Sequence, residues 1–496
     1  MIGVRARRRG SDVDWRRSGD LRREVRAGLV WSLCNNAAGR AGQLVTGIVL
    51  AHLLAPEVFG VFTVALVAFS LVVNVSEMGV SVALVREPDH TDAIAPTVTT
   101  IAVVSASVLA VGCFLSAPTV ADVMRTPGAV GSLRILSLAI VVAGATAVPS
   151  ALVQQQFRQD VRMAADVTSL VVSIGLAVPL AAAGFGPSSL AWAWVASNAA
   201  SGLVLVWKSP SRHIPGFDPD EARRLLRFGL PLAASSLLVF AILNVDYVVV
   251  GRLLGATALG CYVLAFNLAS WPVNLFSTSV RAVSLPGFAR LLAEPEALRS
   301  GFTRSLGQLM AVALPVCALL GALALPAIRL VYGSRWDPAA DALRWLAVLG
   351  GLRVAFELTY DYLVALGLSR IVLWVQLTWL ALLVPVLAAG AHLGGIGGVG
   401  LGQIAVAGGV ITPIYLGVLA RRGIPRRQVG ASLVRPVGGA VAAAAVAVCV
   451  QRAVPGLVAS LAAAGLAGLA VHLLVVWPLV PRRARTLIDT AVSDAA

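Results

Sequence analysis

Two short stretches, Leu54-Ala-Pro-Glu-Val-Phe-Gly60 and Leu254-Gly-Ala-Thr-Ala-Leu-Gly260, mark equivalent places in two halves of the sequence. The same offset brings further identical residues into register and sets Phe62 against Tyr262. These identities are Val49/Val249, Leu53/Leu253, Ala65/Ala265, Ser70/Ser270, Asn74/Asn274 and Val80/Val280. The chain is therefore predicted to contain an internal repeat.

The composition is that of a membrane protein. Of the 496 residues, 58% are hydrophobic and only 13% are charged, and the mean hydropathy is +0.86. A soluble protein carries roughly 25% charged residues, so this chain has too little polar surface for a water-soluble particle. Its five cysteines lack the spacing of a metal site or a redox pair. We expect an all-α polytopic membrane protein without a cofactor, and we exclude a disordered chain, a disulfide-built secreted domain and a soluble enzyme.

Apolar runs long enough to span a bilayer, about 20 residues each, recur along the chain and predict about fourteen transmembrane helices. The runs lie near 28–53, 61–85, 94–117, 131–153, 163–184, 188–207, 228–251, 257–280, 305–328, 339–366, 371–391, 396–419, 431–450 and 456–480. Six helices return the chain to the same side of the membrane. The two halves are therefore predicted to be parallel repeats about an axis along the membrane normal, a design in which substrate binds between the halves.

This count divides the chain into two six-helix bundles with additions. The expected parts are an Arg-rich cytoplasmic tail (1–27), an N-terminal bundle (28–207), a cytoplasmic loop (208–227), a C-terminal bundle (228–420), two further helices (421–480) and a cytoplasmic tail (481–496). The net charge of +15 comes almost entirely from arginines between the apolar runs, which fits a topology signal better than nucleic-acid binding. With both termini in the cytoplasm, few arginines remain outside: Arg125, Arg252, Arg329, Arg335 and Arg452.

Several longer segments resemble a known family. They are LAPEVFGVFTVALVAF (54–69), NVDYVVVGRLLGATALGCYVLAFNLA (244–269), VRAVSLPGFARL (280–291) and AIRLVYGSRWDPAADALRWLA (327–347). These segments are similar to the Wzx-type polysaccharide or O-antigen flippases, lipopolysaccharide biosynthesis proteins of the multidrug/oligosaccharidyl-lipid/polysaccharide exporter superfamily. The resemblance implies a MATE-like fold, in which two six-helix bundles form a V around a central cavity.

The resemblance also implies an activity. The protein would move a polyprenyl-pyrophosphate-linked oligosaccharide across the cytoplasmic membrane by alternating access, without catalysing a reaction. Its partners would be this substrate, membrane lipids, and the polymerase and glycosyltransferases of the same pathway, with no nucleic acid. An ion-coupled drug or metabolite exporter of the same fold is the alternative, although it favours acidic cavity walls. A membrane enzyme usually carries a large extramembrane loop, and the longest loops here, 208–227 and 281–304, are short.

Polar residues at membrane depth are the candidate substrate site, because a charge at the centre of a spanning helix costs about 2.5–3.5 kcal/mol. Asn36, Arg40 and Gln43 share one face of the first predicted helix. The guanidinium of Arg40, near the midplane, can hold a pyrophosphate bidentately or pair with an acid on a neighbouring helix. The full predicted set is Arg40, Asn36, Gln43, Asn74, Asn274, Arg281 and Arg353.

Four carboxyl groups are candidates for coupling transport to H⁺ or Na⁺: Glu77, Asp246, Glu357 and Asp361. Glu77 and Asp246 are favoured because neither has a basic residue within one helical turn, although Asp246 could pair with Arg252. Glu357 follows Arg353 by four residues on one helix face, which also allows an ion pair between them. One further motif, Gly395-Ile-Gly-Gly-Val-Gly400, matches GxGxxG but opens a predicted transmembrane helix, so we expect small-residue packing there.

Overall fold

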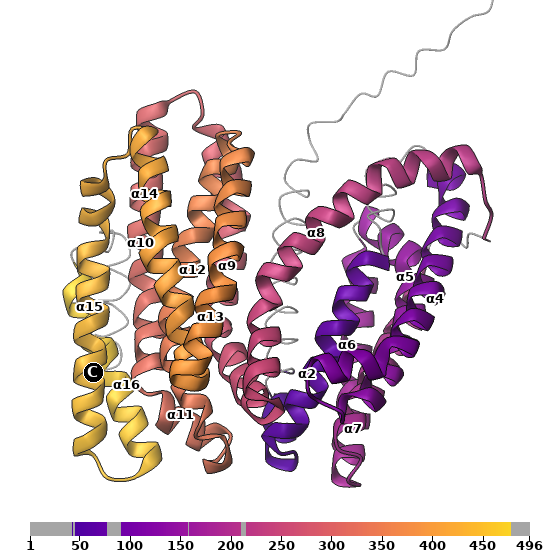
Figure 1. The fold of residues 1–496 in the computed structure, drawn as a ribbon. Helices are drawn as coiled ribbons and strands as arrows, with labels where there is room; N and C mark the ends of the chain where they lie inside the picture. Colours follow the sequence, from indigo (N-terminus) through magenta and orange to yellow (C-terminus); the bar gives the residue numbers. More distant parts are fainter. Residues whose placement is uncertain (1–41, 43–44, 77–90, 157, 210–214, 478–496) are drawn as a thin grey trace, which may run out of the picture.

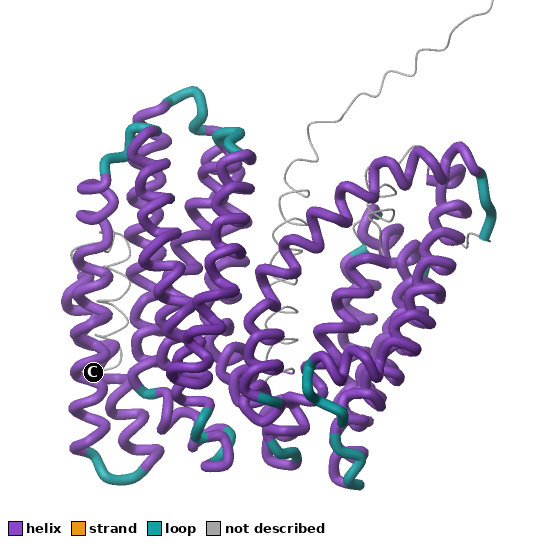
Figure 2. Tube along the Cα trace, viewed as in Figure 1, coloured by secondary structure: helices purple, strands orange, loops and turns teal. Residues whose placement is uncertain are grey.

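The computed structural model describes residues 42, 45–76, 91–156, 158–209 and 215–477. Every regular element in these ranges is a helix, and the helices stand in two groups that meet at one end and lean apart toward the other (Figures 1 and 2). Within the described ranges, ten helices are long and apolar enough to span a bilayer. The all-α membrane fold is thus confirmed, while the count of fourteen helices and the proposed domain limits stay predictions.

The N-terminal half builds the first group. Its helices are α2 (Pro56–Ser76), α4 (Thr91–Val123), α5 (Ala129–Gln155), α6 (Gln159–Ala182) and α7 (Pro187–Trp207). Helix α4 packs along α5 and α6 packs along α7, and α5 links these pairs by contacting both α7 and α2. Small residues allow close approach, as is common between membrane helices: Gly144 of α5 lies directly against Ala106 and the carbonyl of Ala102 on α4.

The second group is larger. Its helices are α9 (Ala256–Arg290), α10 (Pro295–Ala322), α11 (Ala324–Val331), α12 (Ala339–Ala365), α13 (Ser369–Val406), α14 (Thr412–Arg421), α15 (Arg426–Ala453) and α16 (Leu457–Val476), with a short 3-10 helix, η3 (Ser334–Trp336), and a short π-helix, η4 (Ala407–Ile411). Helix α12 is central and contacts α9, α10 and α13. The last two helices, α15 and α16, pack on each other and on α10.

Helix α13 joins two of the predicted spans through a kink. Gly394 and Gly395 leave the helical conformation, and Gly395 has a φ of +57°, which only glycine adopts readily. Gly390 before the kink and Gly398 after it face each other so closely that a Cβ on either would meet the other's carbonyl. Gly397 and Gly400 of the GxGxxG motif lie against α12, so these two glycines serve helix packing, as expected.

Helix α8 (Pro219–Leu254) connects the two groups. It contacts α4 and α2 in the first group and α13 and α9 in the second. In Figure 1 it runs from the end where the groups lean apart to the end where they meet. We refer to these ends as the splayed end and the closed end.

The internal repeat forms the contact at the closed end. Helices α2 and α9 begin at the repeat mates Pro56 and Ala256 and pack on each other. Gly60 lies against the carbonyl of Ala256, and Gly260 lies against the carbonyl of Pro56. Because each helix start packs on its repeat mate, both repeats leave the same end of the molecule, as parallel repeats require.

Candidate functional site

Trp336 makes a second contact across the closed end. Its indole N–H donates a 3.0 Å hydrogen bond to the carbonyl of Ala51 in the N-terminal half. Its ring meets Phe59 of α2 edge-on, with 5.3 Å between the ring centroids. The side chain is completely buried, so a loop of the second group is anchored inside the first by one large aromatic residue and its polar handle.

An ion pair fixes the loop that carries Trp336. Arg329, near the end of α11, donates from Nε to Oδ1 of Asp337 at 2.9 Å and from Nη2 to Oδ2 at 2.7 Å. These hydrogen bonds hold the pKa of Asp337 below its usual value. The bidentate arrangement gives the loop a defined geometry even though the pair is partly exposed to solvent.

Asp246 is the centre of a buried polar cluster in the second group. Its Oδ2 accepts hydrogen bonds from Oη of Tyr262 and from Nε2 of Gln403, both at 2.9 Å. Gln403 also donates to the Tyr262 hydroxyl at 3.0 Å, and all three side chains are buried. The cluster ties α8, α9 and α13 together. The possible pair with Arg252 is not formed: Arg252 is exposed, and Asp246 is satisfied from other helices.

Arg353 lies beside this cluster on α12. Its guanidinium stands over the ring of Phe266 at 5.6 Å, a cation–π contact, and Tyr247 packs edge-on against the same ring. The possible Arg353–Glu357 ion pair is not formed, although both side chains are described. Arginine before glutamate is the weaker order for a pair four residues apart, and the aromatic ring offers Arg353 another partner.

The other two acids of α12 have different surroundings. Asp361 is buried and accepts a 2.6 Å hydrogen bond from the Ser284 hydroxyl of α9. Oε2 of Glu357 is buried without a hydrogen-bond partner in the described part of the chain. Asp361 therefore serves the contact between α12 and α9, whereas Glu357 has an oxygen free to accept a hydrogen bond.

The structure gives fewer contacts for the remaining predicted residues. Asn74 is half-buried and donates to the carbonyl of Ser70 in its own helix at 2.8 Å, while Asn274 is exposed on α9. Four other predicted residues lie outside the described residues: Asn36, Arg40, Gln43 and Glu77. The backbone of Arg281 is described, but its side chain is not. Their roles stay predictions.

Three residues of the described site were not predicted from the sequence. Tyr262 differs from its repeat mate Phe62 by one hydroxyl, and Gln403 is a single amide in an apolar run. Both are polar groups at membrane depth, where such groups are costly unless they have partners, so the same argument could have found them. Trp336 lies in a loop between helices, where hydrophobic periodicity gives no signal.

Sequence comparison relates the chain to proteins of polysaccharide biosynthesis. Residues 49–341 match the profile of a family described as "Polysaccharide biosynthesis protein". The lipopolysaccharide biosynthesis protein WzxC of Escherichia coli (strain K12) is 27% identical over 392 residues, which cover 78% of this chain and 79% of that protein. The succinoglycan biosynthesis transport protein ExoT of Rhizobium meliloti (strain 1021) is 29% identical over 350 residues, which cover 69% and 70%.

Solved structures show the same fold. The lipid II flippase MurJ in an inward closed conformation aligns with a TM-score of 0.76 at 14% identity, over 90% of this chain and 98% of that one. An inward-facing MATE-family multidrug transporter of the MOP superfamily aligns with a TM-score of 0.61 at 17% identity, over 77% and 94%. The expected MATE-like fold is confirmed, and with more than half of its length matched, the chain belongs to the polysaccharide biosynthesis protein family.

Proposed function

We propose that the protein moves a polyprenyl-pyrophosphate-linked oligosaccharide across the cytoplasmic membrane for cell-surface polysaccharide synthesis. Membership of the family and the likeness to WzxC, ExoT and MurJ support this function. The observation that carries it is the single closed end, where α2 meets α9 and Trp336 enters the first group, while the groups lean apart elsewhere (Figure 1). Alternating access requires one end to be shut while the other is open.

The splayed end is proposed to face the cytoplasm, with both termini on that side. The helix starts at this end carry Arg223, Arg227 and Arg426, whereas the closed end carries few cations, among them Arg329 and Arg335. Membrane proteins keep their arginines and lysines on the cytoplasmic side. In this orientation the structure is the state that receives substrate from the inner leaflet.

The pyrophosphate is proposed to bind arginines between the two groups: Arg40, Arg281 and Arg353. Among the described residues, Arg353 is suited to this role because an aromatic ring, rather than an acid, holds its guanidinium, and its charge stays available. Attraction between unit charges 4 Å apart is about 4 kcal/mol at an effective dielectric constant near 20. The neutral polar residues of the site are proposed to be Asn36, Gln43, Asn74 and Asn274.

Asp246 is the proposed coupling group for H⁺ or Na⁺. A ligand shifts a conformational equilibrium only when it binds the two states with different affinity. Protonation or ion binding at Asp246 changes what Tyr262 and Gln403 hydrogen-bond to, and these residues belong to three helices near the connection between the groups. Glu77, Glu357 and Asp361 are the other candidates; Asp361 is already engaged by Ser284.

A reconstituted system tests the function. Purified protein is placed in vesicles that contain a fluorescent polyprenyl-pyrophosphate oligosaccharide, and a membrane-impermeant lectin reports the sugar that reaches the other leaflet. We expect exchange only in vesicles that contain the protein. If lipid exchange is the same with and without the protein, and the vesicles that contain the protein export a cationic dye, the result would instead support the ion-coupled drug exporter.

Arg40 tests the proposed handling of the pyrophosphate. We expect Arg40→Ala to abolish flipping at a normal level of membrane protein, and Arg40→Lys to restore it only in part, because an ammonium lacks the planar fork of a guanidinium. Arg134→Ala is the matched control, since Arg134 stands over Phe114 within the first group. A drop in protein level for Arg40→Ala, reversed by removing an acid on a neighbouring helix, would assign Arg40 to an internal ion pair.

A further inference from the structure

The start of α8 is fixed to the first group at the splayed end. Ala222 and Leu225 are buried, and Leu225 belongs to an apolar cluster with residues of α4 and α5. The chain just before the helix is hydrogen-bonded to α4: the Thr100 hydroxyl donates to the carbonyl of Gly216 at 2.7 Å, and the N–H of Asp218 donates to the Thr97 hydroxyl at 3.2 Å. The first turns of α8 are therefore a firm platform.

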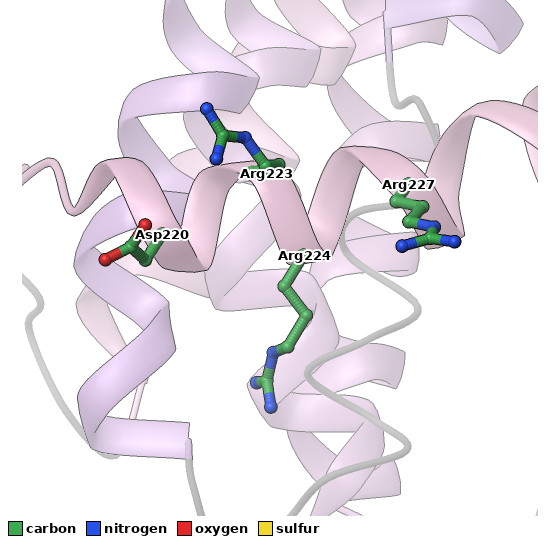
Figure 3. Close-up of a pocket in the computed structure, with 4 residues that line it drawn as sticks. All are labelled: Asp220, Arg223, Arg224 and Arg227. Atoms are coloured by element: carbon green, nitrogen blue, oxygen red, sulfur yellow. The ribbon is translucent and has the colours of Figure 1, made fainter.

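The opposite face of this platform is basic. Arg223, Arg224 and Arg227, with Asp220, line a pocket of about 450 Å³, and their side chains fan out from the first turns of α8 (Figure 3). Arg224 is partly neutralised by Glu221 at 3.0 Å. Arg223 and Arg227 lie one turn apart and form no ion pair with a described residue, so two cationic groups are available to an anion.

An apolar groove adjoins the basic face. It has a volume of about 500 Å³ and is lined mainly by α4 residues, including Ile101, Val104 and Val108, with Phe217 and Leu226 beside the platform. Val104, Val108 and Phe217 are 56%, 65% and 65% exposed. Leu226 follows Arg223 by three residues, a spacing that makes side chains neighbours on a helix. The groove and the arginines are thus parts of one surface.

We propose that this surface binds an anionic glycerophospholipid of the membrane. Arg223 and Arg227 take the phosphate of the headgroup, and the groove takes part of an acyl chain. Basic pockets at the cytoplasmic ends of membrane helices bind anionic lipid headgroups, and here the chain has a complementary groove beside the charge. Helix α4 lies on the side of the first group that faces away from the second group (Figure 1). A resident lipid fits this place better than a transported one, which must enter between the groups.

Native mass spectrometry of the purified full chain tests the charged half of the site. Phosphatidylglycerol and phosphatidylcholine are titrated against the wild type, against Arg223→Gln/Arg227→Gln, and against the control Arg426→Gln/Arg427→Gln. The control removes two exposed arginines from the start of α15 at the same end of the molecule. Charge-assisted hydrogen bonds are about twice as strong as neutral ones. We expect phosphatidylglycerol binding to fall at least about 10-fold in the first double variant only. An equal fall in both would show general attraction to a basic surface and overturn the proposal.

A second pair of variants tests the groove. Val104→Trp fills it and should weaken phosphatidylglycerol binding, whereas Val111→Trp, at another exposed position of α4 outside the groove, should not. Equal binding by the two tryptophan variants would remove the acyl chain from the proposal. A polyprenyl pyrophosphate added as competitor should not displace phosphatidylglycerol. Displacement at lower concentration than phosphatidylglycerol itself would assign the surface to the transported lipid instead. The proposal rests on the proposed cytoplasmic orientation of the splayed end, but not on the proposed transport of a lipid-linked oligosaccharide.

Discussion

The two halves of the molecule share a joint but differ in their buried polar chemistry. Gly60 and Gly260 make reciprocal contacts at the starts of α2 and α9. A second pair of equivalent positions is Thr46 and Asp246. The Thr46 hydroxyl donates a hydrogen bond to the carbonyl of Gly42 within its own helix. Asp246 instead accepts hydrogen bonds from Tyr262 and Gln403 on two other helices. A contact between repeat mates constrains both halves equally. A polar cluster within one half carries no such constraint, so it is free to specialise.

Enlarging the glycines of the joint should have the largest effect. Gly60→Leu and Gly260→Leu each place a side chain on the backbone carbonyl of the opposite helix, which cannot yield as a flexible side chain would. Overpacking costs about 1–3 kcal/mol, and a clash with a backbone carbonyl belongs at the upper end of this range. We expect flipping to fall at least about 10-fold, and the thermal unfolding midpoint to fall, by similar amounts in both variants.

Gly47→Leu is the matched control for the joint, since a Cβ there meets no atom within 4 Å. Flipping rates and unfolding midpoints of the three variants are measured side by side. A large loss in only one of the two joint variants would show that the reciprocal contact does not weigh equally on the two halves.

Substitutions at Asp246 and its repeat mate sharpen the difference between the halves. In Asp246→Asn an amide replaces a carboxylate that accepts two side-chain hydrogen bonds, and a buried mismatch of this kind costs about 1–3 kcal/mol. We expect flipping to fall about 5-fold or more and to lose its dependence on the H⁺ or Na⁺ gradient. Thr46→Val should change neither the flipping rate nor its dependence on the gradient by more than a small amount. If Asp246→Asn keeps the same gradient dependence, coupling lies elsewhere.

Trp336→Phe tests the second contact of the closed end. Phenylalanine keeps the ring contact with Phe59 and removes the hydrogen bond to Ala51. A net loss of about 1 kcal/mol shifts the equilibrium between closed and open states by about 5-fold. Spin labels at the exposed positions Asp122 and Ser334 report the distance between the groups. We expect a longer-distance population in Trp336→Phe and none in the control Trp345→Phe. If the distribution of spin-label distances is unchanged, the glycine contacts alone keep the closed end shut.

The ion pair behind Trp336 should have the smallest effect. The pKa of Asp337 is lowered from its ordinary value of 3.8. Its pairing therefore contributes fully above that ordinary pKa and is lost only as the pH falls through the lowered one. Between about pH 5 and pH 8 the spin-label distance should therefore depend on pH in the same way in the wild type and in Asp337→Asn. Asp337→Asn should lengthen it less than Trp336→Phe does, because exposed ion pairs stabilise little. A pH dependence in this range that is present in the wild type and absent in Asp337→Asn would contradict this assignment.

Features encoded by composition and by the repeat were predictable from the sequence. The helical membrane fold follows from the apolar runs, and the repeat that makes Gly60 and Gly260 equivalent is visible in the sequence, whereas the contact between the two helix starts appears only in the structure. The cluster around Asp246 was not predictable, since it joins three helices from distant parts of the chain. Arg353 shows why local spacing misleads: the ring of Phe266 on another helix, rather than Glu357 one turn away, is its partner.

The length of α8 has a mechanical consequence. Its 36 residues follow a curved path of about 54 Å (Figure 1), whereas the hydrocarbon core of a bilayer is about 30 Å thick. The helix therefore cannot be contained upright within the core, and its arginine-bearing start extends beyond it. Because the helix is continuous along this curved path, a change in its direction at the closed end moves its far end by more than it moves the residues near the joint. Small adjustments where the glycines meet are thereby amplified into movement at the opposite face of the membrane.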